Sequence, residues 1–304
     1  MNNATTVSYF LLLELSKNQH LQLLYFFFFF VLYLATLTTN LLIISAVVFD
    51  HRLHSPMYFF LMNLALQDLG IVSVIVPKSM INCLLDTRQI SYFGCVAQVF
   101  LFLSFEASDV SLLTVMAYDR YVAICNPLHY EIVMTWKACI EIIILVWVAG
   151  LLCGILHTIG TFSVHFCSNV VNQFFCEIPQ LIKLSCSGFN LVEIGIVVAN
   201  IIAALGCFSF IFISYAVIFK AVLRIPSEQG RQKALSTCIP HFIVVSVLIL
   251  SVCFAYLRPP SNSSSDLDFG STVVYSLLPP LFNPIIYSMR NKNIKCVLSQ
   301  LWRF

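Results

Sequence analysis

Seven long apolar runs constrain the fold of this chain more than any other feature of its sequence. They lie near residues 23–49, 57–80, 93–123, 139–161, 192–222, 235–257 and 269–289. A helix that crosses the hydrocarbon core of a bilayer needs about 20 mostly apolar residues. Seven such helices with their loops use nearly all of the 304 residues. The runs therefore predict an all-α membrane protein, a bundle of seven transmembrane helices that forms one domain over residues 1–304.

The composition agrees with a chain whose main solvent is lipid. Hydrophobic residues make up 60% of the chain and charged residues only 10%, which is too little polar surface to coat a water-soluble globule of this size. The net charge is +2, and the sixteen Lys and Arg residues are scattered. They form no basic face that could bind the phosphate backbone of a nucleic acid. We therefore exclude nucleic acid as a partner and expect membrane lipid to surround the protein.

The distribution of basic residues predicts how the bundle is oriented. An odd number of spans places the termini on opposite sides, and loops rich in Lys and Arg stay in the cytoplasm. Eleven of the sixteen basic residues fall on the side that holds the C-terminus. The N-terminus is therefore expected outside. Two sequons, at Asn3 and Asn262, fall on that outer side and are candidate glycosylation sites.

Four cysteines lie on the predicted outer side. Cys95 begins the third span, and the loop before the fifth span holds Cys167, Cys176 and Cys186. In an oxidising compartment they predict two disulfides, and their number leaves three pairings open.

An acid–base pair, Asp119-Arg120, ends the third span on the cytoplasmic side. Such a pair can open when a bundle rearranges, as in a switch, or it can simply anchor the helix at the interface. The surrounding string MAYDRYVAIC, followed by PLHY, closely resembles the signature of the vertebrate olfactory receptors, a family of rhodopsin-like G-protein-coupled receptors. This resemblance favours the switch.

Further segments resemble the same family over nearly the whole chain. They are LHSPMYFFL from Leu53, Ser214-Tyr215, KALSTC from Lys233 with His241, and PLFNPIIYSMRN from Pro280. The chain departs from the family at Thr39, where glycine is usual, at Asp109, where glutamate is usual, and at Leu248-Ile249-Leu250, where Phe-Tyr-Gly is usual. The tyrosine of that triplet, with its usual activation contact, is missing.

The resemblance implies a function and a set of site residues. It implies the disulfides Cys95–Cys176 and Cys167–Cys186, and coupling to the stimulatory olfactory G protein, which raises cyclic AMP. It further implies a location in the plasma membrane, in the cilia of olfactory neurons. We also expect a short amphipathic helix at the C-terminal end. The residues expected to carry activation are Asp119, Arg120, Tyr121, Tyr215, His241, Asn283, Pro284 and Tyr287.

Acidic residues inside the spans need a partner or a function. Asp68 and Asp109, with Asn283 expected nearby, form a hard oxygen site that fits a small cation, which the resemblance suggests is sodium. The alternative is a carboxylate pair that shares a proton and binds no metal. Apart from this possible sodium ion, no cofactor is expected.

Glu106 shares one face of the third span with Phe102 and Asp109. At 1.5 Å per residue it lies about 16 Å deeper than Cys95, near the middle of the membrane. It is therefore a candidate contact for a small-molecule odorant, or else a neutral glutamate bonded to a neighbouring helix. The rest of the predicted pocket consists of small or apolar positions that equally suit helix packing, namely Ala199, Ala203, Val252, Cys253, Tyr256, Val273 and Ser276.

Other function classes find less support. A transporter would show repeated pairs of Gly- or Pro-broken spans, and none is visible. A membrane enzyme needs convergent catalytic groups, whereas His157, His165 and His241 are isolated in the sequence. The main alternative is a related receptor for an internal small molecule outside the nose.

Overall fold

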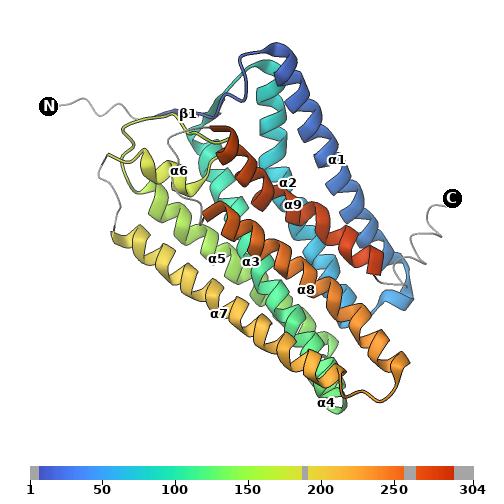
Figure 1. Ribbon diagram of the computed structural model, residues 1–304. Coiled ribbons are helices and arrows are strands. Elements are labelled where there is room, and N and C mark those ends of the chain that lie inside the picture. Colours follow the sequence, from blue (N-terminus) through green and yellow to red (C-terminus); the bar gives the residue numbers. More distant parts are fainter. Residues whose placement is uncertain (1–6, 187–190, 257–264, 291–304) are drawn as a thin grey trace.

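The computed structural model describes residues 7–186, 191–256 and 265–290. Within these residues seven helices are long and apolar enough to cross a membrane, and Figure 1 shows them packed side by side as one bundle. They are α1 (Gln19–Phe49), α2 (Pro56–Leu85), α3 (Tyr92–Cys125), α5 (Trp136–Phe162), α7 (Leu191–Val222), α8 (Glu228–Tyr256) and α9 (Ser265–Arg290). The predicted seven-helix fold is confirmed.

The helix bounds follow the predicted spans closely, with one larger difference. The sixth apolar run was expected to start near residue 235, whereas α8 begins at Glu228. Its first turns are polar, so a search for apolar runs misses them. The expected amphipathic C-terminal helix, and the sequons at Asn3 and Asn262, lie outside the described residues.

Polar side chains at the helix starts explain several of these bounds. The side chain of Asn18 accepts from the backbone N–H of His20 at the start of α1. Ser91 and Thr135 cap α3 and α5 in the same way. Each cap satisfies a backbone donor that has no partner within its helix.

A compact layer covers the outer end of the bundle. Strand β1 (Tyr9–Leu11) pairs antiparallel with β2 (Gln89–Ser91), and on its other side Leu11 bridges to Val170. The short helix α6 (Ile178–Lys183) completes the layer, beside β1 in Figure 1. Because Phe10 of β1 is fully buried, the N-terminal segment is an integral part of this layer.

The cytoplasmic end carries shorter elements. A 3-10 helix, η1 (His51–Leu53), connects α1 to α2, and α4 (Pro127–Val133) follows α3. Asp50, between α1 and η1, accepts hydrogen bonds from Arg52, and these hold the pKa of its carboxyl at about 2. The carboxylate of Asp50 therefore stays ionised, and paired with Arg52, at physiological pH.

Close helix packing in the bundle depends on two glycines of α5. Gly150 and Gly154 face Ser108 and Ser104 of α3 with no room for a side chain. In a membrane, small residues four apart allow helix backbones to approach, and the resulting contacts hold the helices together. The pair fixes α5 against α3, the helix that carries most of the candidate site.

Candidate functional site

The centre of the bundle holds a polar cluster that links three helices. Asp68 of α2 is buried, and its two carboxylate oxygens accept from Nδ2 of Asn283 on α9 at 3.1 and 3.2 Å. Asp109 of α3 is also buried, and its Oδ1 has no hydrogen-bond partner among the described residues. Asp68 lies within electrostatic reach of both Asp109 and Glu106. The cluster thus combines carboxylate oxygens with an unused acceptor, as a small hard cation requires.

Proline chemistry ties the same part of α9 to α1. Pro284 has no N–H, so the carbonyl of Pro280 four residues earlier lacks its usual helical donor. Nδ2 of Asn40 donates to that carbonyl at 3.1 Å. The buried Asn40 thereby supplies the hydrogen bond that α9 lacks at Pro280, one turn from Asn283.

A segment of the outer loop descends over the predicted pocket. The disulfide Cys95–Cys176 joins this loop to α3, and Cys167–Cys186 closes a second bridge within the loop. Beside Cys176, the ring of Phe175 is fully buried, and its centroid lies 5.2 Å from that of Phe102. Phe175 therefore lies above the α3 face that carries Phe102 and Glu106.

Hydrogen bonds hold this loop segment against three helices. The backbone N–H of Cys176 donates to Oε1 of Gln98 on α3 at 2.8 Å, and Oγ of Ser79 on α2 donates to the carbonyl of Phe174 at 3.2 Å. Gln173 donates to Thr272 of α9 at 2.7 Å. The segment is thus anchored to α2, α3 and α9 and forms a fixed roof.

The predicted ligand residues fall in different surroundings. Phe102, Val273 and Ser276 are buried within the bundle, and Glu106 is partly buried. Ala199 and Ala203 are exposed on α7. Val252, Cys253 and Tyr256 belong to the last two turns of α8, where the structure describes no side chains.

A polar contact lies next to Ala199 on α7. Asn200 contacts the ring of His157 on α5, and its Oδ1 lies 3.8 Å from the Cys153 thiol. In this part of α7, Asn200 is therefore a residue whose side chain points toward α5.

The cytoplasmic end of α3 holds a three-residue polar cluster. The carboxylate of Asp119 is buried, and its Oδ2 accepts from Nε of Arg120 at 2.8 Å. Its other oxygen accepts from the hydroxyl of Tyr130 on α4 at 2.8 Å. Burial and the nearby carboxylate raise the pKa of Tyr130, so its hydroxyl stays protonated and keeps donating. Both oxygens of Asp119 are therefore engaged, and Arg120 is held against its own helix.

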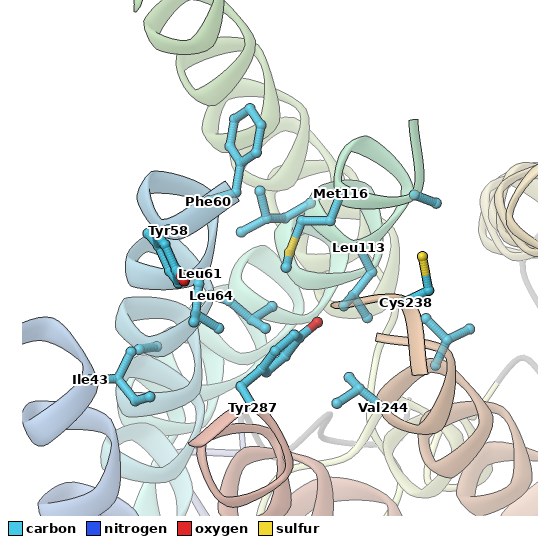
Figure 2. Close-up of a cluster of buried hydrophobic side chains, with 14 of the residues drawn as sticks. Ile43, Tyr58, Phe60, Leu61, Leu64, Leu113, Met116, Cys238, Val244 and Tyr287 are labelled. Atoms are coloured by element: carbon cyan, nitrogen blue, oxygen red, sulfur yellow. The ribbon is translucent and has the colours of Figure 1, made fainter. Parts of the chain in front are cut away.

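Aromatic side chains connect this cluster to the other helices. The hydroxyl of Tyr215 on α7 lies 2.7 Å from Nδ1 of His241 on α8, and the two rings stack. Figure 2 shows Tyr287 of α9 pointing between Leu113 of α3 and Val244 of α8. Side chains from α3, α7, α8 and α9 thus belong to one buried cluster in the cytoplasmic half of the bundle.

Comparison with known proteins decides the family. A family model described as "Olfactory receptor" matches residues 29–303. This chain belongs to the olfactory receptor family. Human olfactory receptor 14A16 is 47% identical over 99% of this chain and 97% of its own length, and human olfactory receptor 14C36 is 48% identical over 100% and 97%. Squid rhodopsin shares the fold, with a TM-score of 0.72 at 17% identity over 93% of this chain and 81% of its own.

Family membership settles the broad function. The protein is an olfactory G-protein-coupled receptor, a multi-pass protein of the plasma membrane and not an enzyme. The string MAYDRYVAIC, which resembles the family signature, forms the last turns of α3 at the cytoplasmic face of this receptor.

The structure adds residues that the sequence analysis did not select. Gly150 and Gly154 carried a visible signal, because two glycines four apart in an apolar run mark close helix packing. Tyr130 ends the PLHY string of the family signature, although the sequence analysis assigned it no role of its own. Gln98 and Phe175 carried no signal, since their roles depend on contacts between segments far apart in the chain.

Proposed function

We propose that this olfactory receptor binds a small volatile molecule below the outer-loop roof and signals through a stimulatory G protein that raises cyclic AMP. The observation that carries the proposal is the position of Glu106, one turn below Phe102 on the α3 face that Phe175 covers. An apolar space with few polar groups suits a small ligand that is held mainly by burial. The remaining pocket positions proposed are Ala199, Ala203, Val252, Cys253, Tyr256, Val273 and Ser276.

The polar character of the pocket suggests a ligand class. Glu106 is partly buried, and no hydrogen bond of its carboxyl group is described. A carboxyl group in an apolar site gains most from a ligand that donates a hydrogen bond or carries positive charge. We therefore expect amines among the agonists, together with neutral odorants that bind by burial alone.

The cytoplasmic cluster supports G-protein coupling. Arg120 is paired with Asp119 in this structure, and release of that pair would free the guanidinium for a partner. Below it, α4 presents two apolar side chains, Leu128 at 89% and Ile132 at 73% exposure. Apolar side chains this exposed on a cytoplasmic helix suit a protein interface. We propose that both features contact the G protein, with Tyr121, Tyr215, His241, Asn283, Pro284 and Tyr287 relaying the rearrangement.

We also propose that Asp68 and Asp109 hold a sodium ion. The unpartnered Oδ1 of Asp109 and the carboxylate of Asp68 would supply ligands, and Asn283 would orient Asp68. A bound ion would neutralise part of the charge between α2 and α3. A receptor whose thermal stability is the same in sodium and in choline chloride would argue for the shared proton instead.

A panel of odorants across chemical classes tests the proposed function in cells that express the receptor and the stimulatory olfactory G protein. We expect at least one agonist to raise cyclic AMP, and Arg120→Ala to abolish that response at unchanged surface expression. Lys137→Ala is a matched control, because this lysine is exposed and its contact with Glu141 is long, at 3.9 Å. If Arg120→Ala loses surface protein together with signal, Arg120 is an anchor and not a coupling residue.

A second substitution tests the pocket. Glu106→Gln keeps the size of the side chain and its hydrogen bonding but removes the charge. Responses to amines should fall more than responses to alcohols or ketones, while Glu141→Gln on the cytoplasmic side should leave the ranking unchanged. An unchanged ranking in Glu106→Gln would show that Glu106 is structural.

The alternative is a receptor for an internal small molecule outside the nose. Both readings fit the proposed site around Glu106, because burial of an apolar molecule would hold either ligand. Localisation of the protein in the cilia of olfactory neurons, which we propose, separates them.

A further inference from the structure

The loop between α7 and α8 carries a serine that the proposed function does not use. Residues 223–227 connect the two helices at the same end of the bundle as α4 (Figure 1). Ser227 is the last residue of this loop, and it is exposed, as are Arg224 before it and Glu228 after it. Its hydroxyl group therefore faces the cytoplasm, the compartment that holds ATP and the protein kinases.

The residues before Ser227 match what one class of protein kinase binds. Arg224 stands three residues before Ser227, and within the described residues it makes no ion pair. Kinases that select basic substrates bind an arginine at this position through carboxylates, which pair with its planar guanidinium. They bind the surrounding segment as an extended chain. Pro226 favours that form, because the residue before a proline is disfavoured in the helical region.

The first turn of α8 offers little resistance to such binding. A kinase must extend a few residues after Ser227, and these belong to α8. Glu228 and Gln229 are exposed, so their extension uncovers little buried surface. Gly230 weakens this turn, since glycine is a poor helix former. Its backbone N–H donates to the Ser227 hydroxyl over a long distance of 3.3 Å. The turn can therefore open without disturbing the core of the bundle.

A second serine shows how the structure distinguishes equal sequence patterns. Ser55 also stands three residues after an arginine, Arg52. This guanidinium is already held by the carboxylate of Asp50, through hydrogen bonds of 3.0 and 2.7 Å. Leu53, between the two, is fully buried, so an extended chain here would withdraw it from the core. Ser227 has neither obstacle.

We propose that Ser227 is a phosphorylation site for a cytoplasmic kinase that selects arginine three residues before the acceptor serine. The hydroxyl oxygen of Ser227 attacks the γ-phosphorus of ATP. The bond between this phosphorus and the oxygen that bridges it to ADP breaks, and a bond from the phosphorus to the serine oxygen forms. The hydroxyl proton passes to a base of the kinase, and ADP leaves. The product is a phosphate ester that carries about −1.5 to −2 charges at pH 7.

The new phosphate acts on the start of α8. Its oxygens accept from backbone N–H groups of the first turn, among them that of Gly230, which already reaches the hydroxyl of Ser227. The segment from Arg224 to Arg231 holds two arginines and one glutamate, a net charge of +1. Phosphorylation brings this charge to about −1. The modification thus orders the start of α8 and reverses the charge of the loop.

Phosphate transfer is measured on the purified receptor in nanodiscs, with ATP, Mg²⁺ and a calcium/calmodulin-dependent protein kinase, which selects this arginine position. Tryptic cleavage after Arg224 and Arg231 releases residues 225–231, in which Ser227 is the sole residue with a hydroxyl group. We expect mass spectrometry to find one phosphate on this peptide in most of the receptor, and none on the peptide that contains Ser55. The assay needs neither agonist nor G protein, so its outcome is independent of the proposed function.

Two matched variants test recognition by the kinase. Arg224→Gln removes the charge before Ser227 and should slow its phosphorylation roughly tenfold or more, because a charge-assisted pair with the kinase is lost. Arg52→Gln makes the same change before Ser55 and should leave the rate at Ser227 unaltered. Equal rates in Arg224→Gln and the unmodified receptor would overturn the recognition, and the absence of phosphate from residues 225–231 would overturn the site.

Hydrogen exchange of the backbone amides of residues 228–231 tests the structural consequence. Exchange should slow several-fold after phosphorylation, because the phosphate binds N–H groups that otherwise open to water. Ser227→Ala, treated with the same kinase, should show no slowing. Unchanged or faster exchange in the phosphorylated receptor would refute the ordering of α8.

Discussion

Replacement of Gly154 by alanine tests the packing of α5 against α3, on which the site depends. A Cβ at this position would meet Oγ of Ser104 and would lie 2.7 Å from the backbone oxygen of Phe100. Ser104 can rotate, but the Phe100 carbonyl belongs to the helix backbone and cannot move aside alone. Gly154→Ala therefore forces the two helices apart.

The expected cost follows from two opposing effects. Overpacking of a well-packed interior costs about 1–3 kcal/mol. Alanine gains up to about 1 kcal/mol over glycine in helix propensity. The net loss is therefore up to about 2 kcal/mol, which corresponds to a fall in Tm of up to roughly 8 °C by the scaling for large soluble domains.

Thermal unfolding of the purified receptor, followed by tryptophan fluorescence, measures this loss. Gly206→Ala is the matched control, because no atom lies within 4 Å of a Cβ at Gly206 and only the gain in propensity remains. The double variant Gly154→Ala/Ser104→Ala should recover only part of the stability, since the clash with Phe100 persists. If Gly154→Ala is as stable as Gly206→Ala, the close contact between α3 and α5 is refuted.

Three further outcomes follow from single contacts. Tyr130→Phe removes a donor to Asp119 and should raise agonist-independent cyclic AMP up to several-fold, since about 1 kcal/mol shifts an equilibrium about fivefold; unchanged basal signal would contradict this. Cys176→Ser frees the loop from Cys95 and should lower surface expression, and peptide mapping that links Cys95 to another cysteine would refute the pairing. Phe10→Ser places a hydroxyl in a fully buried position and should speed proteolysis of the N-terminal segment, whereas Tyr9→Ser, at 41% exposure, should not.

The spans were predictable because lipid imposes one strong requirement on the sequence. Each of the seven apolar runs became a helix, and the largest error was the polar start of α8 at Glu228. Strand β1 was not predictable. Its partners lie near residues 90 and 170, and no local pattern in a three-residue strand identifies them.

The candidate site was predictable where residues share one helix. Phe102, Glu106 and Asp109 follow from the helical repeat of α3 alone. Contacts between helices were not, because they depend on the rotation of each helix about its axis. The contact of Asn200 with α5 is an example, since the sequence selected its neighbour Ala199 for the pocket but gave no sign of this contact.

The most direct test of the central claim uses the purified receptor in nanodiscs with the purified stimulatory olfactory G protein and an agonist from the odorant panel. The quantity measured is the rate of nucleotide exchange on the G protein. We expect the agonist to accelerate exchange, and Arg120→Ala to bind the same agonist without acceleration. Agonist binding to the unmodified receptor with no change in the exchange rate would contradict the account.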